Sequence, residues 1–209
     1  MKRFLLFVPV LLLSLFSCKT KSVNLLPSIS GKAGEVLIVM EKSDWQGGLG
    51  ESVRVTLEQE YPYLPMYEPY YSLINVTKAN FVEMFQVHRN IVYFDIDPQV
   101  QKPGVRIIRD QWAAPQIIVN VSAYTSEEAI ELFNTNKELI MVAIEQAERD
   151  RVVRNTFRYE NREVAAEIKP IFGGSLHVPS GWKVRKLTRN FAWIQYDNRN
   201  STQGLFIYR

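Results

Sequence analysis

Cysteine is almost absent from this 209-residue chain, since Cys18 is the only one. A single cysteine cannot form a disulfide within the chain. The fold must therefore be held together by its hydrophobic core. A hydrophobic content of 46% and an aromatic content of 12% are ample for such a core.

The chain also lacks a strong excess of charge of one sign. Removing residues 1–17, which carry Lys2 and Arg3, lowers the formal net charge from +3 to about +1. Proteins that bind nucleic acids normally contain a strongly basic domain, so we expect no nucleic-acid partner. We find no internal repeat, and the remaining 192 residues predict one large or two small domains.

The apolar run near the start of the chain is too short to span a membrane. Phe4–Phe16 comprises 13 residues, or about 20 Å of helix, and contains Pro9, whereas a span needs about 20 residues. The preceding Lys2 and the following Ser17-Cys18 are typical of a bacterial lipoprotein signal, in which the cysteine is acylated and the chain is cut before it. We predict lipidation at Cys18, which leaves no thiol for a disulfide, a zinc site or a cysteine nucleophile. An ordinary secretory signal and an uncleaved segment are the alternatives.

The distribution of polar, glycine and apolar residues divides the chain into four parts. Residues 1–17 are predicted to be the signal peptide, and residues 18–33, rich in polar and turn-forming residues, a tether. Residues 34–172 are predicted to form an α+β domain. Gly173-Gly174 is the expected boundary, and residues 173–209 are expected to begin a second, mainly-β domain that is incomplete.

The hydrophobic patterns predict a mixed sheet with flanking helices, one of them long. Strands are expected at 35–40, 72–76, 90–96, 105–109 and 116–121, and in the second part at 175–178, 182–187, 191–196 and 204–208. Helices are expected at 49–61, at 77–87 behind a Thr77 cap, and at 126–159, with a short one at 163–168. The long helix opens on a Thr125/Glu128 capping box and has a kink or break near 134–136.

The last residues, Gly204–Arg209, form an apolar, strand-forming run. Only about 35 residues follow Gly174, fewer than a domain without disulfides or metals usually needs. We therefore expect the chain to stop early and residues 175–209 to lean on the first domain.

A set of short motifs spread over most of the chain resembles one known family. They are Leu26-Pro27-Ser28, Gly31–Glu35, His88–Ile91, Ala147–Arg151, Val178–Trp182, Phe191–Ile194 and Gln203–Tyr208. With them the sequence resembles the uncharacterised lipoproteins of Bacteroidetes-type bacteria that carry a domain of unknown function. The resemblance implies no activity, since none is established for that family, and it implies a chain that continues past the last motif.

Three motifs that could carry chemistry are weak. Gly31-Lys32-Ala33-Gly34 has the glycines of a phosphate loop, but it precedes a strand instead of following one, so we expect a turn. Asp95 and Asp97 end a strand just before Pro98, where carboxylates commonly form turns. No Gly-x-Ser-x-Gly elbow accompanies His88 or His177. We predict no catalytic residue, no cofactor and no metal ligand.

The segment 61–71 is the best candidate for a binding surface, because it combines five tyrosines with three prolines. Tyrosines on a stiff loop can stack on sugars or grip a peptide. The alternative is a connector whose tyrosines cover the core. The candidate surface consists of Tyr63, Tyr67, Tyr70, Tyr71, His88 and Arg89.

A second candidate surface is the row of arginines at helical spacing, Arg151, Arg154, Arg158 and Arg162. Such a row could meet lipid phosphates. Its segment, however, holds as many acidic as basic residues, with Glu145/Arg149 and Asp150/Arg154 four residues apart. We therefore expect a solvated, salt-bridged helix.

These observations predict an envelope lipoprotein that acts by binding or by structural support. It would be anchored by lipid, in the outer membrane and facing the periplasm, with an envelope protein or a polysaccharide as its partner. The alternatives are a hydrolase of envelope polymers and a carrier of a lipid or peptide. An enzyme would bring His88, Asp95 or Asp97 together in a pocket, whereas a carrier would contain a deep apolar cavity.

Overall fold

The computed structural model describes residues 25–174 and 176–209. The predicted signal peptide, Cys18 and the first part of the tether lie outside the described residues. No helix within the described ranges is long and apolar enough to cross a bilayer.

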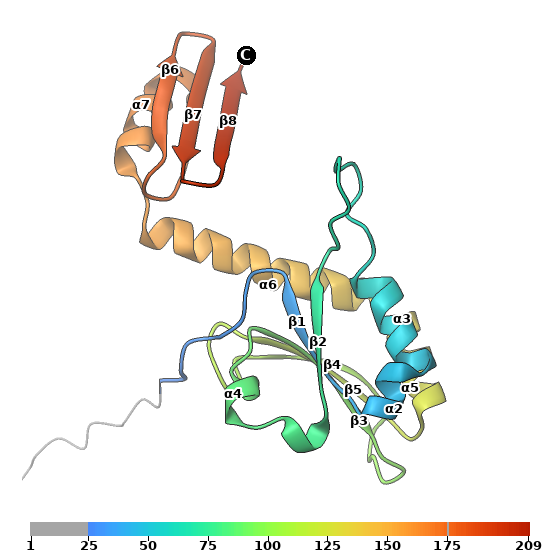
Figure 1. Cartoon of the computed structure of the whole chain (residues 1–209). Coiled ribbons are helices and arrows are strands. Elements are labelled where there is room, and N and C mark those ends of the chain that lie inside the picture. Colours follow the sequence, from blue (N-terminus) through green and yellow to red (C-terminus); the bar gives the residue numbers. More distant parts are fainter. Residues whose placement is uncertain (1–24, 175) are drawn as a thin grey trace, which may run out of the picture.

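The first part of the chain is built on a five-stranded sheet with the strand order β2-β1-β3-β5-β4 (Figure 1). The strands are β1 (Glu35–Val39), β2 (Ser72–Val76), β3 (Asn90–Ile96), β4 (Gly104–Arg109) and β5 (Ile117–Ala123). Four of them are parallel, and β4 pairs antiparallel with β5 at one edge. The near-continuous apolar runs of β1, β3 and β5 fit strands that are buried on both faces. The predicted α+β class with a mixed sheet is confirmed.

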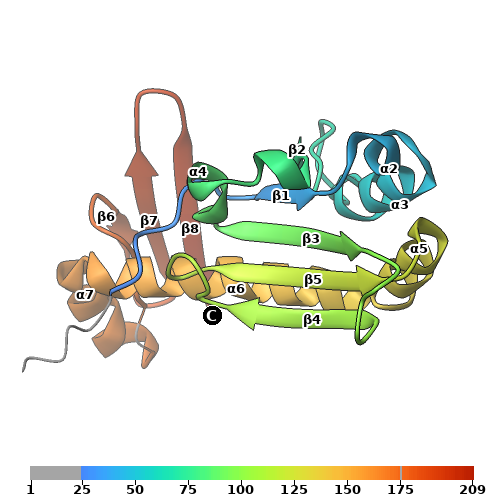
Figure 2. The ribbon, with the colours of Figure 1, turned by 90° about the horizontal axis from the view of Figure 1, so that it is seen from below.

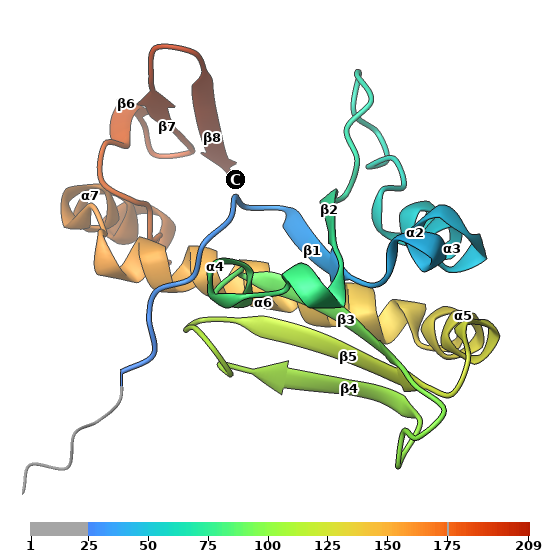
Figure 3. The same ribbon diagram turned by 60° about the horizontal axis from the view of Figure 1, so that its bottom comes forward.

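Helices cover both faces of this sheet (Figure 3). Since successive side chains of a strand point to opposite sides, each strand contributes to two separate cores. Ile38 and Val92 belong to the core beneath α3 (Gly48–Leu57), α5 (Ser126–Thr135) and α6 (Lys137–Arg158). Leu37 and Ile91 belong to a smaller core on the other face. That face is covered by the short helices η1 (Lys78–Asn80) and α4 (Glu83–Gln86). One further short helix, α2 (Lys42–Gln46), directly precedes α3.

The long helical signal is divided as the sequence predicts. α5 ends at Thr135 and α6 begins at Lys137, so the break falls in the predicted interval. Thr125 Oγ1 accepts a hydrogen bond from the Glu128 backbone N–H at 3.2 Å, which confirms the cap at the start of α5. α6 then runs alongside the strands of the sheet (Figure 2). It carries Ile140, Ile144 and Ala147 on its buried side.

Two predicted helices are shorter than expected. The helix predicted over 49–61 ends at Leu57, and a loop held by a hydrogen bond from Tyr61 N to Glu68 O follows it. The helix predicted over 77–87 is replaced by η1 and α4, with non-helical backbone at Phe81 and Val82. This interruption lets Phe81 and Phe85 both pack on the sheet, while Met84 points to solvent.

The second part of the chain is a three-stranded antiparallel sheet with one helix packed on it. The strands are β6 (Lys183–Leu187), β7 (Phe191–Asp197) and β8 (Thr202–Tyr208). Helix α7 (Arg162–Phe172) contributes Val164 and Ile168 to the same core as Ala192 and Ile194. Residues 176–178 form no strand, contrary to the prediction.

Helix α7 packs on the sheet of the second part, although the sequence pattern assigns its residues to the first domain. The predicted boundary at residue 173 falls between α7 and the sheet on which α7 packs. The prediction that this helix ends before Pro170 is wrong, because it continues to Phe172 and ends on Gly173 in a left-handed conformation. The missing Pro170 N–H removes one helical hydrogen bond near the end of α7, yet the helix continues to Phe172, which packs against the core of the second part.

Candidate functional site

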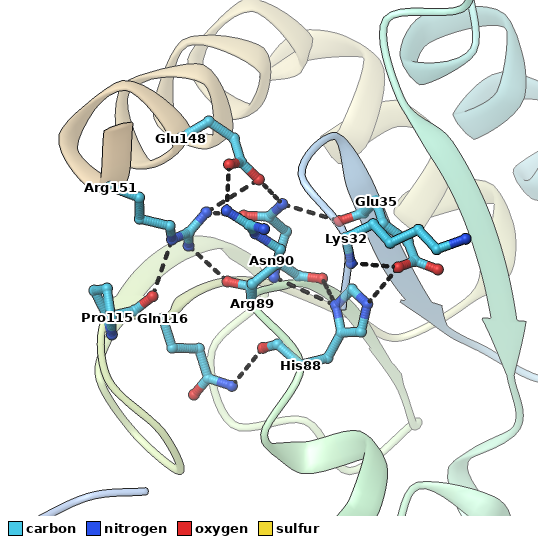
Figure 4. A network of polar contacts seen from close by, with 9 residues as sticks. All are labelled: Lys32, Glu35, His88, Arg89, Asn90, Pro115, Gln116, Glu148 and Arg151. Carbon is cyan, nitrogen blue, oxygen red and sulfur yellow. Dashed lines mark hydrogen bonds and ion pairs between the residues drawn. The ribbon is translucent and has the colours of Figure 1, made fainter. Parts of the chain in front are cut away.

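A network of charged and amide side chains lies where the amino ends of three parallel strands meet helix α6 (Figure 4). Because β1, β3 and β5 are parallel, their first residues lie at one edge of the sheet. Glu35 opens β1, Asn90 opens β3, and Gln116 directly precedes β5. α6 brings Glu148 and Arg151 to the same edge, so segments far apart in the sequence converge there.

Glu148 is the centre of this network. Its carboxylate accepts hydrogen bonds from Arg89 Nη2 at 2.7 Å and from Asn90 Nδ2 at 2.7 Å. It also forms an ion pair with Arg151 Nη1 at 3.2 Å. One largely buried carboxylate therefore pairs with two largely buried guanidinium groups, which leaves the three side chains with a formal charge of +1.

Arg151 is the most enclosed charged side chain in the network, with 8% of its surface exposed. Its guanidinium donates to Pro115 O at 3.0 Å, to Asn90 Oδ1 at 2.8 Å and to Arg89 O at 2.7 Å. Burial lowers the pKa of Arg151, and the neighbouring Glu148 carboxylate opposes this shift. The side chain thus joins α6 to the starts of both β3 and β5.

His88 occupies the buried end of the network. Its Nδ1 lies 3.0 Å from the Asn90 carbonyl oxygen, and its Nε2 lies 3.8 Å from Glu35 Oε2. Burial lowers the pKa of His88 below its usual 6.5, although the Asn90 carbonyl and Glu35 act in the opposite direction. His88 therefore serves as a neutral, enclosed side chain at neutral pH.

We expect the stability of the fold to fall as the pH drops below about 6.5. In the unfolded chain His88 takes up its proton near its usual pKa, while the folded chain does so only at lower pH, so the unfolded state binds more protons in that window. Melting temperatures of the wild type and His88→Gln at pH 7.5 and 5.5 measure this effect. The wild type should lose more on acidification than the variant, and equal losses would contradict the assignment.

A cleft of about 690 Å³ opens beside the network. We call it the arginine cleft, because Arg89, Arg151, Arg154 and Arg158 line it together with one carboxylate, Glu148. Its remaining lining is mostly apolar or neutral: Ser28, Ile29, Ala33, Ala114, Pro115, Val152 and Asn155. The cleft therefore combines apolar lining residues with a surplus of positive charge.

The model of one protein family, described as a domain of unknown function (DUF8532), matches residues 29–157, which is more than half of the chain. The chain belongs to this family. The matched range includes the sheet, the polar network and nearly all of α6. Searches of curated proteins and of solved structures gave no significant match.

Within the DUF8532 domain, the six residues of the predicted binding surface lie at two places. Tyr63 and Tyr67 are exposed on the loop between α3 and β2, whereas Tyr71 is buried in the main core. Burial raises the pKa of Tyr71 to about 12. His88 and Arg89 belong to the polar network, and Tyr70 packs against Tyr61. The exposed tyrosines stay a prediction as a binding surface, while Tyr71 and His88 are enclosed.

The other residues singled out from the sequence have local partners. Asp95 pairs with Lys78 at 3.4 Å, and Asp97 accepts a hydrogen bond from Gln99 N in a turn, as expected. His177 lies 2.6 Å from Glu160 Oε1. His88 precedes β3 and Asp95 stands near its other end, roughly 23 Å away along an extended strand. Residues 25–174 and 176–209 contain no group of three potential metal-binding side chains.

Two expectations for the arginine row were wrong. Arg151 is buried, and Asp150 pairs with Arg109 at 3.6 Å instead of with Arg154. The surface pair Glu145/Arg149 is confirmed. A signal for the burial of Arg151 was present, since Arg151 continues the helical spacing of Ile140, Ile144 and Ala147. Asn90 belongs to the motif His88–Ile91 but was not singled out as a site residue, and no sequence pattern pointed to a site role for Gln116.

Proposed function

We propose that this protein is a lipid-anchored, non-enzymatic binding or structural module of the cell envelope. The observation that carries the proposal is the sequence around Cys18, in which a basic start and a short apolar run lead directly to the only cysteine. Acyl chains on that residue would hold the protein stably if two or more are attached.

The non-enzymatic assignment is supported by the arrangement of the candidate acid and base groups. His88 and Asp95 stand at opposite ends of β3, and Asp95 is paired with Lys78. Within the network, Glu148 is held by hydrogen bonds from Arg89 and Asn90 and by an ion pair with Arg151. A carboxylate bound in this way is suited to support the structure and is poorly placed to exchange protons with a substrate.

We further propose membership of the Bacteroidetes-type lipoproteins that the motifs resemble. Two of those motifs, His88–Ile91 and Ala147–Arg151, meet in the network through Arg89, Asn90, Glu148 and Arg151. Their contact gives a physical reason for the two motifs to occur together. We place the protein in the outer membrane, facing the periplasm, and propose an envelope protein or polysaccharide as its partner, with the exposed Tyr63 and Tyr67 as contact points.

Substitution of Cys18 by serine is expected to abolish incorporation of labelled palmitate. Serine has no thiol to acylate, so the acylated, mature form should disappear from the membrane fraction. Metabolic labelling followed by fractionation of the cells measures both effects. Ser22→Ala, four residues further on, is the matched control and should label like the wild type.

Unchanged palmitate labelling of Cys18→Ser would contradict the proposed lipid anchor at Cys18. Protease treatment of intact cells tests the orientation separately. A protein that faces the periplasm should resist the protease until the outer membrane is permeabilised, and digestion in intact cells would contradict that orientation.

A further inference from the structure

We propose that the arginine cleft binds the phosphate group of an anionic lipid headgroup, supplied by the membrane to which the protein is anchored. The proposal deepens the envelope function above and rests on it for the source of the ligand. The charge, hydrogen bonding, size and position of the cleft each support it.

The cleft carries a surplus of positive charge that the protein itself leaves uncompensated. Glu148 serves Arg89 and Arg151, whereas Arg154 and Arg158 have no ion pair within residues 25–174 and 176–209. The carbonyl end of α6 contributes only about half a negative charge. The lining therefore stays clearly cationic, and guanidinium groups match phosphate oxygens particularly well.

Arg89 supplies a second, independent sign of an anionic partner. Its Nη2 is bound to Glu148, but its Nε is buried and finds no hydrogen-bond partner among the described residues. Buried polar groups are nearly always hydrogen-bonded, and one left without a protein partner calls for a physical explanation. Arg89 also lines the cleft, so a phosphate oxygen bound there would be a suitable acceptor once the guanidinium turns this N–H toward the opening.

The size and the apolar part of the lining favour an esterified phosphate over a free ion. A volume of about 690 Å³ lies within the range of pockets that hold small organic molecules. Ile29, Pro115 and Val152 give the cleft an apolar wall next to its guanidinium groups. A headgroup with a charged phosphate and an apolar glycerol ester presents the same two features.

The tether keeps the cleft close to the membrane. Ser28, which lines the cleft, is only ten residues from Cys18, and ten extended residues span at most about 35 Å. An anchored protein can therefore present the cleft to the lipid surface. The mature chain has a formal charge of about +1, so its general electrostatic attraction to an anionic bilayer would be weak. Binding to anionic lipid would then have to come from a specific site.

The test uses the chain from residue 18 with Cys18→Ser, which keeps every described residue and removes the anchor. Binding is measured by co-sedimentation with vesicles of phosphatidylcholine alone and of phosphatidylcholine with phosphatidylglycerol. We expect binding only to the second kind. The double variant Arg154→Gln/Arg158→Gln, which changes exposed cleft residues, should bind the second kind of vesicle at least about tenfold more weakly.

The matched control is Arg149→Gln/Arg162→Gln, which removes the same charge from exposed positions outside the cleft and should bind like the parent chain. The proposal would be overturned if both double variants bound the anionic vesicles equally weakly. It would also be overturned if the parent chain bound neither kind of vesicle. Stabilisation by soluble glycerol phosphate without vesicle binding would overturn it too, because the ligand would then not be a lipid. Palmitate labelling of the wild type tests the anchor independently of these results.

Discussion

Replacing Glu148 by alanine is expected to lower the free energy of unfolding by about 3–5 kcal/mol, the usual cost of breaking a buried ion pair. The substitution removes the carboxylate that compensates both Arg89 and Arg151. It also removes an acceptor from Asn90 Nδ2. Two enclosed guanidinium groups would then face each other without a counter-charge. Urea unfolding of the purified protein, followed by circular dichroism, measures the change.

Glu145→Ala is the matched control for this prediction, because Glu145 lies one turn earlier on the same helix. Its ion pair with Arg149 is exposed, so its loss should lower the free energy of unfolding far less than the loss of Glu148 does. Glu148→Gln should fall between the two, since the amide oxygen still accepts a hydrogen bond but carries no charge. Similar losses for Glu145→Ala and Glu148→Ala would show that the network contributes no more than a surface pair.

Replacing Gly31 by alanine is expected to cost about 3 kcal/mol, from a strained backbone and a steric clash together. Gly31 has a φ of +87°, in the region that favours glycine. A Cβ at this position would lie 2.4 Å from His88 Nε2, so the buried ring would have to move. Thermal unfolding should show a marked drop in the melting temperature.

Two other glycines separate the causes of that loss. Gly34 has a φ of +74°, but an added Cβ would meet only Tyr70 O at 3.9 Å, so Gly34→Ala should cost about 1 kcal/mol from backbone strain. Gly174→Ala has neither a positive φ nor a neighbour within 4 Å and should be nearly neutral. Equal destabilisation by Gly31→Ala and Gly34→Ala would show that the close approach of Gly31 to His88 adds no cost beyond backbone strain.

Much of the fold could be predicted from local patterns. β3 was predicted with its observed ends, and the break between α5 and α6 was expected near 134–136 from a second capping box, Thr135 with Glu138. These features follow from residue preferences and periodicity, which a single sequence contains. Pro170 shows the limit of this reasoning, because the packing of Phe172 on a distant sheet outweighs the local preference of proline.

The candidate site was predicted only in part, for a related reason. His88 and Arg89 attracted attention as individual polar residues, and Glu148 and Arg151 as members of a charged helix. Their roles depend on the pairing of β1 with β3 and on the passage of α6 beside the starts of the strands. That arrangement arises from tertiary packing, so the conversion of surface charges into a buried network could not be read from helical spacing alone.

The wide sequence separations within this network bear on the order in which the protein folds. Asn90 bonds with Glu35, Glu148 and Arg151 across 55, 58 and 61 residues. Contacts that close such long loops form slowly, because the chain entropy must be lost before they contribute. We therefore expect the network to close after the main barrier of folding. Damage to it would then act mainly by speeding unfolding, so the lifetime of the native state would depend on it more than the folding rate does.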